Sequence, residues 1–144
     1  MATHDWRTGT YAIDPQGRGN FNKQPEGLKG QTFTVVRYFD ASSVNMASAD
    51  VFKVLTIDAG VLVQRIKFLT ATAEGGTATF DVGDSASGTT FDDGIDVNAT
   101  AGTVEATSTL TYKYYSAADY LTLTMNNALD AAKFYMIVEC IRLT

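Results

Sequence analysis

From Thr32 to the C-terminus, the sequence is a succession of short segments in which apolar and polar residues alternate. Residues 78–82 read ATFDV and residues 121–125 read LTLTM. Strict alternation rich in Thr, Val, Tyr and Phe is typical of half-buried antiparallel strands. The predicted strands read TFTVVRYF, VFKVLTI, VLVQRIKFLT, TATFDVG, IDVNA, TVEATSTLTY, YLTLTM and KFYMIVECIRL. We therefore predict an all-β domain.

Turn residues separate these segments. Asp58-Ala59-Gly60 predicts a tight hairpin between VFKVLTI and VLVQRIKFLT, and Glu74-Gly75-Gly76 predicts another before TATFDVG. Seven or eight short strands and no helix of ordinary length indicate an antiparallel β-sandwich. The count favours an eight-stranded jelly roll over the seven-stranded immunoglobulin-like fold, whose Cys…Trp…Cys core is missing. Other sandwiches remain the alternative.

Residues 1–31 have a different character. They hold both prolines, the only tryptophan, the only histidine and five glycines, and they follow no helical or strand period. We expect an extended N-terminal arm over 1–31, followed by the β-sandwich domain over 32–144. Large apolar residues such as Trp6, Tyr11 and Phe21 recur along this arm, although a floppy terminus is the alternative.

The last predicted strand, KFYMIVECIRL, is apolar on both faces. One face carries Phe134, Met136, Val138 and Cys140, and the other carries Tyr135, Ile137, Ile141 and Leu143. A strand of a two-sheet sandwich has one inner face, so the second apolar face needs a cover. The arm, loops of the same chain or a neighbouring subunit could supply it. The last possibility makes Tyr135, Ile137, Ile141 and Leu143 a candidate homo-oligomer interface.

The charge distribution argues against nucleic-acid binding. The net charge is -5, and no basic residue lies between Lys67 and Lys113, although seven acidic residues do. Phosphate binding needs clustered Lys and Arg. No apolar run approaches the ~18 residues of a membrane-spanning helix, and the polar start lacks the layout of a signal peptide. We expect the mature chain to begin near Met1, in a cytosol, with no membrane partner.

Residues for conventional catalysis are scarce. The single histidine, His4, is far in sequence from the single cysteine, Cys140, so Ser-His, Cys-His and zinc arrangements are disfavoured. Cys140 sits in an apolar run, where a free thiol usually serves as a small buried hydrophobe. No glycine-rich phosphate loop is present. We expect no enzyme activity, no catalytic residue, no metal and no cofactor.

An acidic, glycine-rich stretch, DVGDSASGTTFDDGIDVN, allows three interpretations. Its carboxylates, Asp81, Asp84, Asp92, Asp93 and Asp96, could bind calcium, form a catalytic acid pair or keep an exposed loop and sheet edge soluble. Their irregular spacing favours the solvated loop. The run TYKYYSAADY adds Tyr112, Tyr114, Tyr115 and Tyr120, which could form an interface patch or a sugar-binding platform.

Roughly residues 38–105 resemble the core of small virion structural proteins of tailed bacteriophages. The resemblance rests on a strand ending in an AG turn, followed by AEGGTAT, a GD pair and NATAGT. It implies a capsid decoration, or cement, protein: a jelly roll without catalytic residues that sits as an oligomer, often a trimer, on the outer surface of the head. Related sandwiches also serve as head fibres and tail components.

The resemblance implies a chain made in the host bacterial cytoplasm and located on the outer capsid surface of the virion. Its expected partners are further copies of itself and the major capsid protein. The arm would then anchor the domain to the shell. The residues expected to do so are Trp6, Arg7, Tyr11, Arg18 and Phe21. The rival hypothesis is a carbohydrate-binding sandwich that uses the Tyr112–Tyr120 region, and an acidic hydrolase is a more distant one.

Overall fold

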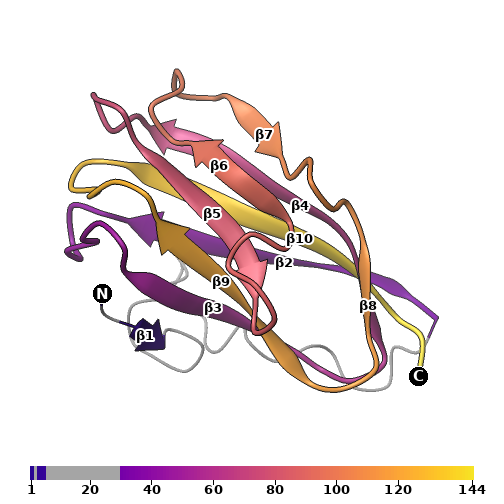
Figure 1. The fold of residues 1–144 in the computed structure, drawn as a ribbon. Coiled ribbons are helices and arrows are strands. Elements are labelled where there is room, and N and C mark those ends of the chain that lie inside the picture. The colour runs from indigo at the N-terminus through magenta and orange to yellow at the C-terminus, as the bar shows by residue number, and fades with distance from the viewer. Residues whose placement is uncertain (2, 6–29) are drawn as a thin grey trace.

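The computed structural model describes residues 1, 3–5 and 30–144. Ten strands and no helix occur in this part of the chain, so it contains no helix that could cross a membrane (Figure 1). The strands are β1 (Thr3–Asp5), β2 (Thr32–Asp40), β3 (Val51–Ile57), β4 (Val61–Thr72), β5 (Thr79–Asp84), β6 (Asp92–Asp96), β7 (Val104–Ala106), β8 (Lys113–Tyr115), β9 (Asp119–Met125) and β10 (Lys133–Arg142).

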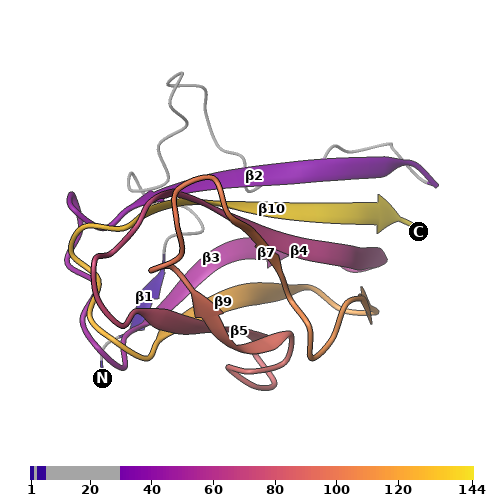
Figure 2. The same ribbon diagram turned by 90° about the horizontal axis from the view of Figure 1, so that it is seen from above.

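The strands form two sheets that pack face to face. One sheet, here the β9 sheet, has the order β1-β3-β9-β5-β6, and the other, the β10 sheet, has the order β2-β10-β4-β7, with β8 also paired to β4. Figure 2 shows the two layers edge-on, with β2, β10 and β4 in one and β3, β9 and β5 in the other. All described pairings are antiparallel except that of β1 with β3.

The connectivity confirms the predicted antiparallel jelly roll. From β2 onward the chain passes repeatedly between the sheets, and the first and last strands of the domain, β2 and β10, lie side by side. The domain has nine strands rather than eight, because β7 and β8 pair with successive parts of the same strand, β4. Between them, the amides of Thr109 and Leu110 both donate to the carbonyl of Phe91 at 3.1 Å, which draws the chain away from β4.

Both predicted hairpins are wrong, although both turns exist. β3 and β4 belong to opposite sheets, as do β4 and β5, so each turn carries the chain across the sandwich. Gly60 adopts a φ of 84° in the first turn, and its amide donates to the carbonyl of Tyr115 at 2.7 Å. In the second, the Glu74 carboxylate accepts backbone bonds from residues 130–132. Turn residues specify a reversal but not the strand that pairs next.

Aromatic rings fill the space between the sheets. Phe80 of β5 lies 5.0 Å from Phe68 of β4 and 5.1 Å from Phe134 of β10, measured between ring centroids. The predicted inner face of β10 is confirmed, because Phe134, Met136, Val138 and Cys140 are all fully buried. Burial raises the pKa of Cys140 to about 12, so its thiol stays protonated and acts as a small apolar group.

Gly83 of β5 lies beneath the loop that follows it, and this contact yields a stability prediction. A methyl group at Gly83 would lie 2.1 Å from the carbonyl oxygen of Ser87 and 2.4 Å from the carbonyl carbon of Gly88. Both are backbone atoms, so the loop would have to move. We expect Gly83→Ala to lower the free energy of unfolding by about 1–3 kcal/mol in urea titrations.

Gly76 is the matched control, since a methyl group there meets nothing within 4 Å. Gly76→Ala should change stability by no more than about 0.5 kcal/mol. Equal effects of the two substitutions would contradict the close packing of residues 87–88 on β5.

Candidate functional site

The outward side of the β10 sheet is the first candidate surface. β10 lies between β2 and β4, so its outward side chains occupy the middle of a sheet face rather than an edge. Of the four predicted interface residues, Tyr135, Ile137 and Ile141 are half-buried on this face, and Leu143 is 48% exposed beyond the end of the strand. The structure therefore places Tyr135, Ile137 and Ile141 together on one face, and Leu143 directly follows the end of β10.

Strand register extends the apolar face beyond β10. One row across the sheet joins Tyr38, Tyr135 and Leu69, with the two tyrosine rings 4.9 Å apart. Two further rows bring Val36 beside Ile137 and Leu62 beside Ile141. We call this set the outer apolar face: Val36, Tyr38, Leu62, Leu69, Tyr135, Ile137 and Ile141. The members on β2 and β4 were not among the predicted interface residues, although alternation in TFTVVRYF places Val36 and Tyr38 opposite the core face.

Polar residues also lie on this outer face. Lys67 is beside Ile137, Thr32 is beside Ile141, and the rows through Lys133 and Glu139 are polar throughout. Glu139 lies between Thr34 and Arg65 in the ladder, and its carboxylate accepts a bond from the ammonium of Lys67 at 2.8 Å. Both partners are partly exposed, so the ion pair adds little stability. Its effect is to keep charge on a face that is otherwise suited to burial against another surface.

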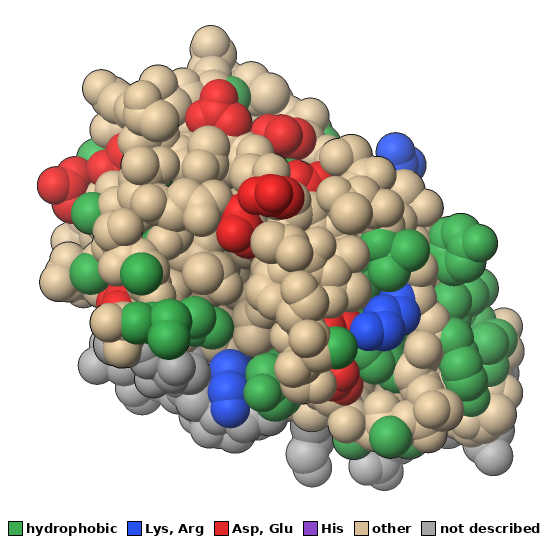
Figure 3. All heavy atoms as spheres, in the orientation of Figure 1, with side chains coloured by type: hydrophobic (Ala, Val, Ile, Leu, Met, Phe, Trp, Pro, Cys, Tyr) green, Lys and Arg blue, Asp and Glu red, His purple; other side chains and the backbone are tan. Residues whose placement is uncertain are grey.

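The outward side of the β9 sheet is different in character. Its central strand presents Tyr120, Thr122 and Thr124, and the adjacent β3 presents Lys53 and Thr56. Figure 3 views the molecule from this side and shows carboxylates gathered over β5 and β6. One sheet thus carries an apolar outer surface and the other a polar one.

The acidic stretch is less exposed than predicted. Asp81, Asp84 and Asp92 are buried, and only the remaining two of the five, Asp93 and Asp96, are exposed, at the edge strand β6. Each buried carboxylate has its own donors. Asn126 donates to Asp81 at 2.6 Å, and the amide and hydroxyl of Ser108 donate to Asp92 at 2.6 and 2.9 Å. The solvated-loop interpretation is therefore wrong for three of the five residues, which instead hold neighbouring segments in place.

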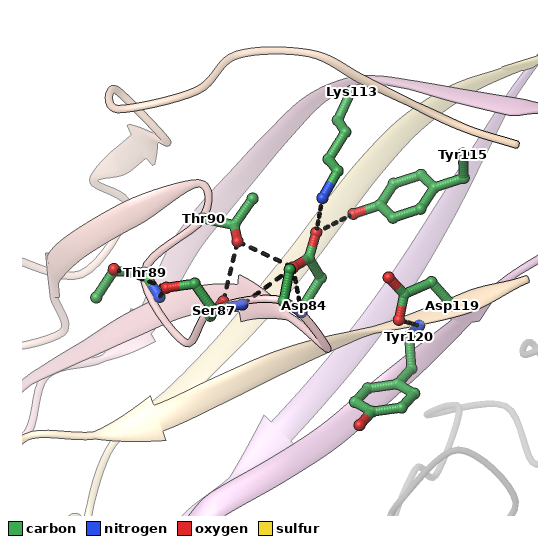
Figure 4. A network of polar contacts seen from close by, with 9 residues as sticks. Asp84, Ser87, Thr89, Thr90, Lys113, Tyr115, Asp119 and Tyr120 are labelled. Atoms are coloured by element: carbon green, nitrogen blue, oxygen red, sulfur yellow. Dashed lines mark hydrogen bonds and ion pairs between the residues drawn. The ribbon is translucent and has the colours of Figure 1, made fainter. Parts of the chain in front are cut away.

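Asp84 is the centre of the largest of these networks (Figure 4). Its carboxylate accepts bonds from the Tyr115 hydroxyl at 2.8 Å, the Thr90 hydroxyl at 2.9 Å and the Ala86 amide at 3.0 Å, and it forms an ion pair with Lys113. Because β5 belongs to the β9 sheet and β8 to the β10 sheet, the network joins the two sheets at one end of the sandwich.

The ionisation of Asp84 follows from this environment. Burial alone raises the pKa of a carboxyl group, but the bonds from Lys113, Tyr115, Thr90 and Ala86 outweigh it and hold the pKa of Asp84 below its ordinary value. Tyr115 responds in the opposite sense, since burial and the neighbouring Asp84 carboxylate raise its pKa. The pair is thus a charged acceptor and a neutral donor at neutral pH.

No group of three acidic, histidine or cysteine side chains in the described part of the chain lies close enough to hold a metal ion. The four candidate tyrosines also do not form one platform. Tyr112 and Tyr114 are 65% and 47% exposed beside the β10 sheet, Tyr115 is buried, and Tyr120 lies on the outer side of the β9 sheet. The connection after β8 changes sheets, and the alternation of the sequence does not reveal that change.

The candidate anchoring residues of the arm, namely Trp6, Arg7, Tyr11, Arg18 and Phe21, lie outside the described residues. Of the predicted arm, β1 is described as a three-residue strand paired in parallel with Val51–Lys53 of β3. The division of the chain between 1–31 and 32–144 stays a prediction.

Comparisons with known proteins identify the fold. No protein-family model matches the sequence, and no curated protein matches it significantly. A chain in the capsid of Ralstonia phage GP4 is similar in structure with a TM-score of 0.65 and 11% identity, covering 99% of this chain and 97% of that one. A chain in the capsid asymmetric unit of cyanophage Pam1 has a TM-score of 0.55 and 18% identity, covering 82% and 89%. At these identities the similarity shows a shared fold.

The Asp84 network yields a prediction with a defined pH dependence. Asp84→Asn removes the charge that Lys113 and Tyr115 bind, and we expect it to lower the free energy of unfolding by about 2 kcal/mol at pH 7. The partial exposure of Lys113 keeps the loss below that of a fully buried pair. Because the folded pKa of Asp84 is lowered, its contribution is present above the unfolded pKa of ~3.9 and disappears as the pH falls through the folded value.

The measurement is urea unfolding of both proteins from pH 7 down to pH 2. The difference between them should shrink with acidification. Ser116→Ala, at an exposed position outside the network, is the control and should change stability by no more than about 0.5 kcal/mol. A difference between wild type and Asp84→Asn that is constant with pH would contradict the charged role of Asp84.

Proposed function

We propose that this chain is a non-enzymatic structural protein of a bacteriophage virion, and specifically a capsid decoration protein that binds the outer surface of the head as an oligomer. The observation that carries the proposal is the jelly roll shared over nearly the full length of both chains with a chain in the Ralstonia phage GP4 capsid. The Pam1 similarity supports it independently. The major capsid protein is the partner that this role requires.

The outer apolar face supports the oligomer. Seven apolar or aromatic side chains point away from the core on three adjacent strands. Burying such a surface favours association by roughly 25 cal/mol per Å² of apolar area before the entropy cost of association is subtracted. We assign Tyr135, Ile137, Ile141 and Leu143 to the contact between copies of this chain, with a trimer as the expected state. In this proposal the subunits stabilise the shell by linking neighbouring capsid proteins.

The arm supplies the proposed attachment to the shell. Trp6, Tyr11 and Phe21 are large apolar groups of the kind that dominate binding energy at protein interfaces, and Arg7 and Arg18 can pair with carboxylates of the major capsid protein. The net charge of -5 fits a position on the outside of the head, because packaged DNA repels an acidic protein.

The oligomer can be tested with one substitution in the middle of the outer apolar face. Light scattering on a sizing column should give the wild-type chain a mass near three times 15.5 kDa. Ile137→Asp places a charge where the proposed contact excludes water, and we expect it to give a mass near 15.5 kDa. Ser116→Asp, at an exposed position between β8 and β9, is the control and should leave the trimer intact.

A wild-type mass of one chain would contradict the subunit contact. It would mean that the arm or loops of the same chain cover the outer apolar face. Thermal unfolding of both variants should show that the mass change does not come from loss of the fold.

Attachment to the head is tested by changing the arm in the full-length chain. We expect the combined substitution Trp6→Ala, Tyr11→Ala and Phe21→Ala to abolish cosedimentation with heads that lack the protein, because the arm loses its apolar anchors. The combined substitution Gln16→Ala and Gln24→Ala changes polar residues of the same arm and should retain binding. Full binding by the triple variant would contradict the role of the arm.

Electron microscopy of the reconstituted particles gives the location. Density on the outer surface of the head is the expected result. Density at the tail, or in fibres projecting from the head, would instead identify the chain as a tail or head-fibre component.

A further inference from the structure

The outward side of the β9 sheet carries a hollow of about 390 Å³. Its floor is formed by Thr122 and Thr124 of β9, one wall by Lys53 of β3, and the other wall by Ser85 and Gly88 of the connection between β5 and β6. A second hollow of about 330 Å³ adjoins it and shares Ser85 and Tyr120 with it. Together they have the size of a small-ligand site.

Strand register explains why the sheet is hollow at this point. Thr122 lies between Lys53 on one side and Gly83 on the other. Gly83 has no side chain, so residues 87–88 of the connection between β5 and β6 can fold back over it. The connection therefore forms a wall beside Thr122 and Thr124. A methyl group on Gly88 would lie 3.2 Å from the Thr124 hydroxyl, which shows how closely this wall approaches the floor.

The Thr122 hydroxyl is the observation that points to a ligand. Thr122 is 4% exposed, and its Oγ1 atom is buried without a hydrogen-bond partner. Buried hydroxyl groups in folded proteins are almost always hydrogen-bonded, because an unmade bond is unfavourable. A polar group entering the hollow can supply the missing partner.

Tyr120 adds an aromatic surface to the site. Its ring borders both hollows, and the Lys53 ammonium lies 4.4 Å from the ring centroid. Figure 4 shows this ring pointing away from the Asp84 network, toward the opposite side of the β9 sheet from Tyr115. The hollows therefore combine one aromatic ring, several hydroxyl groups and one ammonium group, and Asp119 also lines the second hollow.

We propose that these hollows bind a pyranose unit of a glycan. A pyranose has apolar C–H faces that pack on an aromatic ring. Its rim of hydroxyl groups can donate hydrogen bonds to the Thr122, Thr124 and Ser85 hydroxyls and accept hydrogen bonds from them. The Lys53 ammonium donates to sugar oxygens. The site is separate from the Tyr112–Tyr115 region and goes beyond the proposed structural role. It lies on the opposite side of the sandwich from the outer apolar face, so an oligomer built through that face leaves it accessible.

The test is a titration of the full-length chain with glucose, galactose, mannose, N-acetylglucosamine and glucuronic acid, followed by amide chemical shifts in NMR spectra. We expect at least one sugar to give saturable shifts at Lys53, Ser85 and Thr122 with a Kd in the millimolar range. Tyr120→Ala should weaken that binding at least tenfold. Tyr112→Ala, at an exposed tyrosine away from the hollows, should leave it unchanged.

Thr122→Val separates binding from folding, because it replaces the hydroxyl with a methyl group of similar size. We expect it to weaken sugar binding severalfold and to raise the midpoint of thermal unfolding of the free protein by a few degrees, since it removes an unpaired buried polar group. A purely structural threonine would not produce these opposite changes.

Three results would overturn the proposal: no saturable response to any of the five sugars, shifts centred on Tyr112 and Tyr114, or sugar binding that Thr122→Val leaves unchanged. None of them bears on attachment to heads, which is measured without sugar, so the glycan site and the decoration role can fail independently.

Discussion

The pairing of β10 with both β2 and β4 is the interaction on which the rest of the structure depends. It places Cys140 beside Phe33 and Phe134 beside Phe39, so residues from the two ends of the domain share one ladder. The same strand carries the rings and aliphatic side chains that fill the core, with Phe134 stacked 5.1 Å from both Phe39 and Phe80. Such long-range pairing restricts the chain strongly before any apolar surface is buried, and the large buried core offsets that loss of entropy.

A central position for β10 also determines what its second face can do. A loop could cover the outward apolar residues of an edge strand. β10 instead has a strand on each side and presents Tyr135, Ile137 and Ile141 in the middle of the sheet. The neighbouring strands add apolar residues in register. The outer side of the β9 sheet is polar, so this fold does not require apolar residues on its outer surfaces. The outer apolar face is therefore particular to the β10 sheet.

Much of the fold follows from the sequence, because alternation is local. Residues 79–82 and 121–125 lie in strands with the predicted faces, and the buried side of β10 is the predicted one. The two hairpins were mispredicted because partner choice depends on distant strands. Burial of Asp84 depends on Tyr115, 31 residues away, and nothing in the local sequence DVGD distinguishes it from an exposed loop. The hollow above Thr122 likewise requires the register with Lys53 and Gly83, which no single segment encodes.

The two outer surfaces of the sandwich are physically suited to different tasks. The outer apolar face gains from exclusion of water and fits permanent contact between subunits, whereas the hollows on the β9 sheet combine polar groups with an open approach and fit reversible binding of a hydrated ligand. Both surfaces are held by strands that share one core, so damage to the core would impair both together. If the proposed roles hold, substitutions confined to one outer surface should affect one task alone, because consecutive side chains of a strand point to opposite sides of its sheet.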